Sequence, residues 1–189
     1  MQRQTVERAI AGDHDAFALL AQTAIASMYA TAKLIVRNDA LAEDATQEAL
    51  VNAWRYLPSL RDPDRFEAWL YRLLVNACRT QFRAGRRFSV VEIDVADANR
   101  GGIGSVGVDP GIAVADRDQL ERGFRRLAAD ERAIVILRFY RGYSVPEVAE
   151  IMGIPLGTAK SRLHRATTAL RAALDADGRL GSVAERSPA

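Results

Sequence analysis

Residues 142–170, GYSVPEVAEIMGIPLGTAKSRLHRATTAL, have the pattern of two short helices joined by a tight turn. Ser144 is a favourable N-cap because its hydroxyl can accept from the free backbone N–H groups of a first turn. Glu147, three residues later, can reach back to complete a capping box. Gly153 can adopt the left-handed conformation at which helices often end. The spacing predicts a helix-turn-helix, a motif that places its second helix in the major groove of DNA.

The second helix of this motif is expected to begin between Pro155 and Thr158 and to have one apolar and one basic side. No acid occurs between Leu156 and Ala173, whereas a solvated helix surface usually mixes both signs of charge. The less specific alternative is a basic surface helix without a partner. The candidate DNA contacts on this helix are Thr158, Lys160, Ser161, Arg162, His164 and Arg165.

Composition limits the classes of protein that this chain can belong to. Its 189 residues, 49% of them hydrophobic, suffice for one domain or two small ones. The net charge is only +2, so the distribution of charge matters more than its sum. Cys78 is the single cysteine, which excludes an internal disulfide and fits a reducing compartment. His14 and His164 lie far apart in the sequence, so we expect no zinc site of the His/Cys type, no other metal and no cofactor.

The pattern along the chain predicts an all-α protein of two small helical domains joined by a flexible linker. Long segments with helical periodicity fill the first part, while the stretch containing GGIGSVGVDPG has none and carries unmatched acids. No apolar run approaches the length of a membrane span, and the N-terminus lacks a signal-peptide core, so we expect a cytoplasmic protein. The predicted divisions are a first domain over 1–88, a linker over 89–115, a helix-turn-helix domain over 116–175 and a disordered tail over 176–189.

A second basic surface is predicted on the helix over 65–87, opposite its apolar stripe. Arginines there could contact phosphates, and an asparagine could hydrogen-bond a base edge. The candidates are Arg72, Asn76, Arg79, Arg83 and Arg86. Aromatic side chains nearby could stack on unpaired bases, although a core position is the favoured interpretation for Phe66 and Trp69. The polar loop SLRDPDRF, residues 59–66, is a natural place to hold a flipped base.

The helix predicted over 42–57 carries a third polar surface. Asp44 and Glu48 are one turn apart, with Gln47 on the flank, and this favours docking of a basic partner protein. The alternatives are a plain solvated surface and an enzyme that uses the two acids as metal ligands or as general acid and base. Catalysis is disfavoured because no third ligand or histidine accompanies the acids and no phosphate-cradling glycine loop precedes a helix. In the second domain, Asp130 is expected to cap a helix over 131–141.

Taken together, three segments resemble the small extracytoplasmic-function group of bacterial RNA polymerase sigma factors. LAEDATQEALVNAWRYL (41–57) is similar to the family's polymerase-binding segment. DRFEAWLYRLLVNACRTQFRAGRR (64–87) is similar to the segment that opens and binds the minus-ten element. The segment over 127–170, which contains the helix-turn-helix, is similar to the minus-thirty-five reader. Each segment alone is moderately specific, but the three in this order are highly specific.

The resemblance implies a non-enzymatic subunit that binds core RNA polymerase and directs promoter recognition and DNA opening. By position, Asp44, Gln47 and Glu48 match residues that face the clamp helices of the largest polymerase subunit. Asn76 matches a position beside the flipped minus-ten base, and Arg79 and Arg83 match contacts to the DNA backbone. Family members are commonly held inactive by an anti-sigma factor, and nothing in this sequence indicates whether one exists. The alternative function is a free-standing helix-turn-helix regulator, which would form dimers on palindromic sites.

Overall fold

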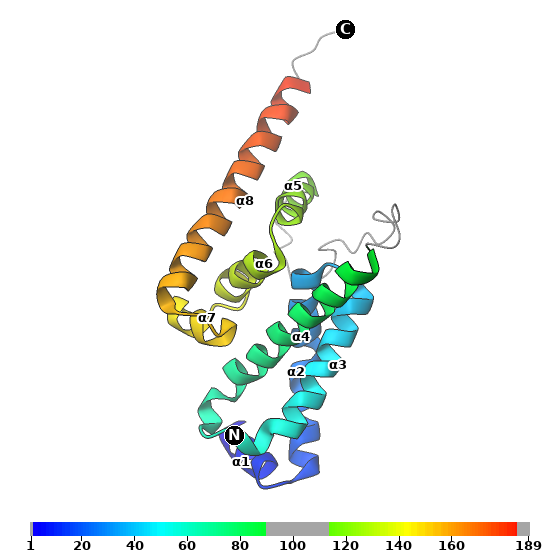
Figure 1. The fold of residues 1–189 in the computed structure, drawn as a ribbon, viewed down its shortest axis with the longest axis vertical. Helices are drawn as coiled ribbons and strands as arrows, with labels where there is room; N and C mark the ends of the chain where they lie inside the picture. The colour runs from blue at the N-terminus through cyan, green and yellow to red at the C-terminus, as the bar shows by residue number, and fades with distance from the viewer. Residues whose placement is uncertain (1, 90–113, 185–189) are drawn as a thin grey trace.

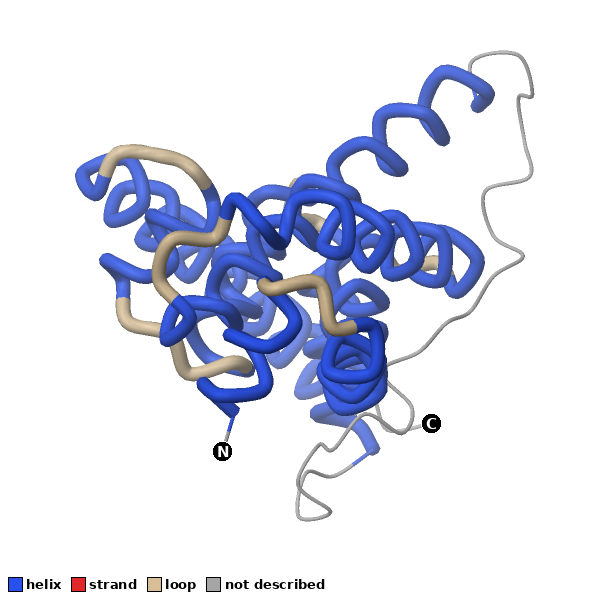
Figure 2. The backbone as a smooth tube through the Cα atoms, turned by 90° about the horizontal axis from the view of Figure 1, so that it is seen from below, coloured by secondary structure: helices blue, strands red, loops and turns tan. Residues whose placement is uncertain are grey.

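The computed structural model describes residues 2–89 and 114–184, and these ranges are helical apart from short loops (Figure 1, Figure 2). The described residues contain no strand, and the all-α prediction is confirmed. The N-terminal unit consists of α1 (Gln2–Ile10), α2 (His14–Val36), α3 (Asp39–Tyr56), the short turns η1 (Leu57–Ser59) and η2 (Pro63–Arg65), and α4 (Phe66–Ser89). The C-terminal unit consists of α5 (Val114–Arg125), α6 (Ala129–Val135), the π-helical turn η3 (Ile136–Tyr140), α7 (Val145–Met152) and α8 (Leu156–Ala184).

Short polar side chains set the helix starts in the N-terminal unit. Gly12 has a φ of 95°, and the Asp13 carboxylate then accepts from the Ala16 backbone N–H at 3.0 Å to begin α2. This hydrogen bond lowers the pKa of Asp13. Asn38 begins α3 in the same way, accepting from Leu41 N–H at 2.9 Å. The helix therefore starts before the predicted residue 42, because the Asn38 cap lets Asp39 join its first turn.

Helix α4 lies at the centre of the molecule, in contact with α2 and α3 on one side and with α6 and α7 on the other (Figure 1). Buried side chains of both units belong to one hydrophobic cluster, in which Met28, Leu74 and Ile134 are fully buried. The two units thus pack together, whereas the sequence suggested independent domains with free surfaces. Periodicity shows that a helix has an apolar side, but it does not show which helix covers that side.

Two further details differ from the sequence-based expectations. Helix α8 continues to Ala184, so the backbone over 176–184 is helical where a disordered tail was predicted. Once a helix exists, each added residue contributes one more hydrogen bond, and glycines weaken such an extension without ending it. Asp130 does not cap α6. Instead, the Glu131 carboxylate accepts from the Ala128 N–H at 3.0 Å. The predicted linker over 89–115 lies mostly outside the described residues, which omit 90–113.

By length and composition alone, helix α2 could cross a membrane. This differs from the sequence-based expectation that no apolar segment approaches the length of a membrane span. The best 18-residue window of α2 has a mean hydropathy of 1.4. The many alanines of α2 raise this average even though polar residues interrupt the helix. The core helix of a globular protein passes the same test, and α2 packs against α1, α3, α4 and α6.

Candidate nucleic-acid interfaces

The helix-turn-helix forms from α7 and α8 as its capping residues predict. The Ser144 N–H donates to the Glu147 carboxylate at 2.7 Å, and the Glu147 N–H donates back to the Ser144 hydroxyl at 3.5 Å. The Ser144 hydroxyl also donates to that carboxylate and is the main cause that lowers the pKa of Glu147. Gly153 ends α7 with a φ of 65°. These contacts set the residues at which α7 begins and ends, and α8 follows after the short turn.

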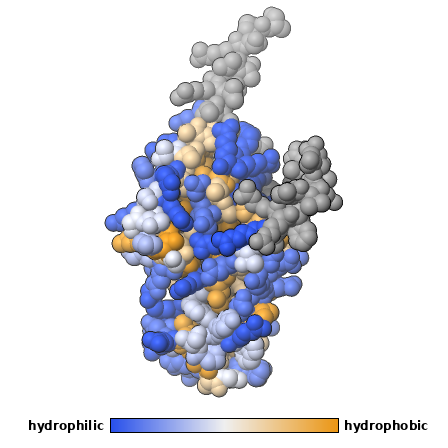
Figure 3. All heavy atoms as spheres, viewed as in Figure 1, coloured by the Kyte–Doolittle hydropathy of each residue, from blue (hydrophilic) through white to orange (hydrophobic). Residues whose placement is uncertain are grey.

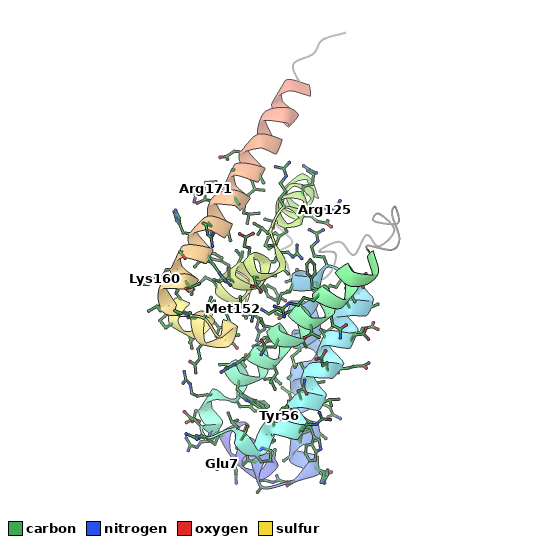
Figure 4. The ribbon with its side chains drawn as sticks, viewed as in Figure 1. Glu7, Tyr56, Arg125, Met152, Lys160 and Arg171 are labelled. Carbon is green, nitrogen blue, oxygen red and sulfur yellow. The ribbon has the colours of Figure 1, made fainter. Side chains whose placement is uncertain are left out.

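Helix α8 presents most of its predicted DNA contacts to solvent. Ala159 and Ala166 are fully buried, and they anchor the apolar side of the helix against α6 and α7. Thr158 is half-buried, and its backbone carbonyl accepts from the Ser161 hydroxyl at 3.0 Å. Figure 4 shows Lys160 and Arg171 on the side of α8 that faces away from α4. The predicted contacts that are exposed are Lys160, Ser161, His164 and Arg165.

Arg162 is the exception on this helix. Its Nη1 lies 3.3 Å from the Asp130 Oδ2, and its side chain is half-buried. Asp130 at the start of α6 also accepts from the Nε of Arg79 on α4, at 2.8 Å. One carboxylate thus joins arginines from both predicted DNA-binding surfaces. Arg79 and Arg162, both predicted DNA contacts, are therefore engaged in intramolecular ion pairs in this conformation.

Most of the other predicted minus-ten contacts on α4 are exposed. Arg72, Asn76 and Arg83 are exposed, while the side chain of Arg86 lies outside the part of the chain that the structure describes. The Nη1 of Arg79 donates to the Asn76 side-chain carbonyl at 3.3 Å and to the Met152 backbone carbonyl at 3.1 Å. Met152 lies where α7 meets α4 (Figure 4). The C-terminal unit therefore contacts the same side of α4 that was predicted to bind DNA.

A hollow of about 380 Å³ lies beside the loop over 59–66. Trp69 lines the hollow and is half-buried, whereas Phe66 is buried in the core. The core interpretation is therefore confirmed for Phe66 only. The lining residues are Ser59, Leu60, Arg61, Asp62, Arg65, Ala68, Trp69, Arg72, Glu150 and Ile151. Glu150 and Ile151 come from α7, so the C-terminal unit forms one wall.

Sequence reasoning missed two residues of this hollow, Arg61 and Arg65, although it identified their loop. Arg65 is exposed and donates to the Glu150 carboxylate. Their signal was available in the sequence, since both are basic residues in a short polar loop directly before a basic helix. Periodicity could not find them because the loop has no repeating face.

The third predicted surface lies on α3. Asp44 and Gln47 are exposed, and Glu48 is half-buried because its carboxylate accepts from the Gln81 side-chain amide of α4 at 3.0 Å. Val51, one turn after Gln47, is 55% exposed. A single exposed apolar side chain is common on protein surfaces, so Val51 alone does not mark this surface as an interface. Among the described residues, no group of three or more His, Cys, Asp or Glu side chains could hold a metal ion.

Comparison with known proteins matches both units to one family. Residues 20–88 match sigma-70 region 2, and residues 117–170 match sigma-70 region 4. The chain is 32% identical over 165 residues to the ECF RNA polymerase sigma factor SigM of Mycobacterium tuberculosis, covering 85% of this chain and 78% of that protein. The RNA polymerase sigma-H factor of Pseudomonas aeruginosa is 33% identical over 182 residues, covering 91% of this chain and 93% of that protein.

The chain belongs to the extracytoplasmic-function (ECF) sigma factors. A solved structure of the sigma factor RpoE in complex with the anti-sigma factor NepR from Bartonella quintana is similar to this sigma factor. The TM-score is 0.65 at 28% identity, over 85% of this chain and 98% of that one. The two matched regions, in their order along this sigma factor, coincide with the N-terminal and C-terminal units described above.

Proposed function

We propose that this chain binds core RNA polymerase in the cytoplasm and directs it to promoters, without bond-making chemistry of its own. Residues 1–88 would bind the polymerase and the minus-ten element, and residues 116–175 would bind the minus-thirty-five element. The main support for this proposal is that one chain contains both a sigma-70 region 2 and a sigma-70 region 4 with an exposed basic helix. The relatives are named as RNA polymerase sigma factors, which supports the same partner here.

The minus-thirty-five contact is assigned to the exposed side of α8. Lys160 and Arg165 would contact phosphates or guanine edges in the major groove, with Ser161 and His164 between them. Thr158 lies at the start of α8, where backbone N–H groups favour a phosphate. Arg162 would join this surface once it leaves Asp130.

The minus-ten contact is assigned to α4 and the hollow beside it. Arg72, Arg79, Arg83 and Arg86 would hold the backbone of the opened strand, and Asn76 would contact a base edge. Trp69, half-buried beside the loop over 59–66, offers an aromatic plane for one unstacked base once α7 has moved away, and base–aromatic stacking tolerates any base. Specificity would then come from the polar groups around that base.

The polymerase contact is assigned to α3. Asp44, Gln47 and Glu48 would meet basic residues of the clamp helices of the largest polymerase subunit, and Val51 would supply the apolar part of the contact. An anti-sigma factor is a further partner that the proposal allows, because the similar RpoE structure was solved with one.

Transcription of genomic DNA fragments by core polymerase from the same organism tests the function. Adding this chain should produce discrete transcripts that are absent without it, and mapping their starts should reveal a shared pair of upstream elements. A dimer that protects palindromic sites without polymerase, and yields no new transcripts, would favour a free-standing regulator instead.

Two pairs of variants test the assigned surfaces within that assay. Arg165→Ala should weaken binding to the upstream element by about 1–3 kcal/mol if Arg165 contacts a base. Arg171→Ala removes the same charge further along α8 and is the control; an equal loss in both variants would refute the base contact. Asp44→Ala with Glu48→Ala should abolish association with the core polymerase, whereas Glu43→Ala on the adjacent part of α3 should retain it.

A further inference from the structure

Ion pairs connect the two units along their contact, here called the seam, where the end of α2, η2 and α4 meet the C-terminal unit. Figure 3 shows hydrophilic and hydrophobic side chains intermixed over the described residues of this face. The pairs between described residues are Arg37–Glu121 at 3.2 Å, Arg65–Glu150, Arg79–Asp130 at 2.8 Å and Arg141–Glu67 at 2.8 Å. Except in the last pair, the N-terminal unit supplies the arginine and the C-terminal unit supplies the acid.

One acid of these pairs, Asp130, occupies a position where a DNA phosphate would lie in the proposed function. Asp130 accepts from Arg79, a predicted minus-ten contact, and lies 3.3 Å from Arg162, a predicted minus-thirty-five contact. A carboxylate and a phosphate present oxygen acceptors of similar charge and geometry to a guanidinium group. Asp130 therefore satisfies arginines of both surfaces with the same kind of bond that DNA would make.

Glu150 acts in the same way at the hollow beside the loop over 59–66. Its carboxylate accepts from Arg65, and Ile151 next to it adds an apolar wall. A base entering this space would meet a negatively charged wall, and Arg65 would already have a partner. The hollow is consequently less favourable for DNA while α7 lies against it.

Buried contacts make the seam more than a set of surface ion pairs. Arg132 of α6 is 5% exposed and donates through Nε to the Ile35 carbonyl of α2 at 2.7 Å and through Nη1 to the Leu127 carbonyl at 2.7 Å. Burial lowers the pKa of Arg132 to about 10, which still leaves it charged at neutral pH. Tyr143 contacts Tyr71 across the same seam, with ring centroids 5.8 Å apart.

We propose that the C-terminal unit is an internal competitor of minus-ten DNA, in which Asp130 and Glu150 take the place of phosphates on Arg79 and Arg65. The inference rests on the proposed function and adds a regulation of the same surface. In this closed form the free chain binds DNA weakly. A partner that binds only the separated units, such as core polymerase together with promoter DNA, shifts the population to an open form. The apparent affinity for DNA falls in proportion to the closed fraction.

Charge-removing variants of the full chain test this competition without polymerase. Asp130→Asn and Glu150→Gln, singly and together, remove the acids and nearly retain side-chain volume. Glu43→Gln, on exposed α3, makes the same change in net charge as either single variant, away from the seam. The probe is a fluorescent single-stranded DNA of mixed sequence, about 12 nucleotides long, whose binding is followed by anisotropy. The double variant should bind about tenfold more tightly than the unaltered chain, and Glu43→Gln within about twofold of it. Equal affinities of the double variant and Glu43→Gln would overturn the inference.

A distance measurement tests the same inference and does not depend on whether the acid variants fold. Dyes are attached at Ala26→Cys on α2 and Ala172→Cys on α8, both exposed, in a chain whose buried Cys78 is replaced by alanine. Adding the oligonucleotide to this chain, with all seam residues intact, should lower energy transfer as the units separate. The double acid variant should show lower transfer than the unaltered chain before DNA is added, because fewer ion pairs hold the units together. DNA binding with unchanged transfer would mean that the closed form and DNA do not compete.

A promoter-specific transcription assay distinguishes failure of the internal competition from failure of the proposed function. If the unaltered chain initiates with core polymerase but the double variant shows unchanged DNA affinity and unchanged transfer, the sigma function stands and the internal competition is refuted. If the chain yields no specific transcripts with polymerase, the proposed function is refuted.

Discussion

Asp130 shows how much of a residue's role depends on what the fold brings beside it. Its position before an apolar run favours a helix cap, but Glu131 makes the capping contact and Asp130 binds Arg79 and Arg162 instead. Both acids are compatible with the first turn of α6, where negative charge is stabilising. Local sequence could not distinguish them because the deciding partners are on α4 and α8.

The buried thiol of Cys78 should make the free energy of unfolding depend on pH. Burial raises the pKa of its thiol from 9.0 to about 12. The unfolded chain therefore loses this proton at lower pH than the folded chain, so the contribution to stability is fully present below about pH 9 and is lost toward pH 12. Relative to Cys78→Ala, the free energy of unfolding should fall by about 1.4 kcal/mol per pH unit in that window. Urea unfolding at a series of pH values measures the difference, and parallel curves for the two proteins would contradict it.

Arg132 is a second residue whose removal should be costly. Arg132→Met keeps much of the side-chain volume but leaves the Ile35 and Leu127 carbonyls without their charged donor. We expect the free energy of unfolding to decrease by about 2–4 kcal/mol, because hydrogen bonds to charged groups are among the stronger ones. Arg125→Met is the control, since Arg125 is exposed and its ion pair with Glu121 is long, at 3.6 Å. Equal urea midpoints for the two variants would exclude the buried contact.

At the scale of elements, the helix-turn-helix was largely predictable because its signals are local. Ser144, Glu147 and Gly153 perform the roles that their residue types favour. The start of α8 at Leu156 lies within the predicted interval. The hollow beside the loop over 59–66 was only partly predictable, because its wall on α7 comes from residues about 85 positions away in sequence.

Gly153, which ends the first helix of the helix-turn-helix, should be sensitive to substitution. Its φ of 65° costs any other residue about 1–2 kcal/mol, while a methyl group there would meet no atom within 4 Å. Gly153→Ala should therefore lower the free energy of unfolding by roughly that amount through backbone strain alone. Gly157→Ala in the first turn of α8 also has open space and no positive φ, so it should be neutral or stabilising by up to about 1 kcal/mol. Thermal unfolding of both variants would reveal whether the two glycines differ in this way.

At the scale of the whole molecule, the arrangement of the two units makes the solution behaviour depend on ionic strength. The Arg79–Asp130 and Arg65–Glu150 pairs are partly exposed, so salt screens them. Raising NaCl from about 0.05 M to about 0.5 M should lower energy transfer between dyes at Ala26→Cys and Ala172→Cys. The same titration should have a smaller effect on Asp130→Asn with Glu150→Gln. A salt response of equal size in both proteins would show that these two ion pairs do not cause the salt dependence of the contact between the units.

Local patterns in the chain account for most helices, their apolar and basic sides, the caps of the helix-turn-helix and the order of the sigma-like segments, because each depends on residues within a few turns of one another. Long-range packing, visible only in the folded molecule, places α4 against α6 and α7, joins Asp130 to arginines from two surfaces and closes one side of the hollow with α7. These outcomes depend on pairing surfaces distant in sequence. Many apolar faces and unlike charges could pair by chemistry alone, and only the folded chain selects among them.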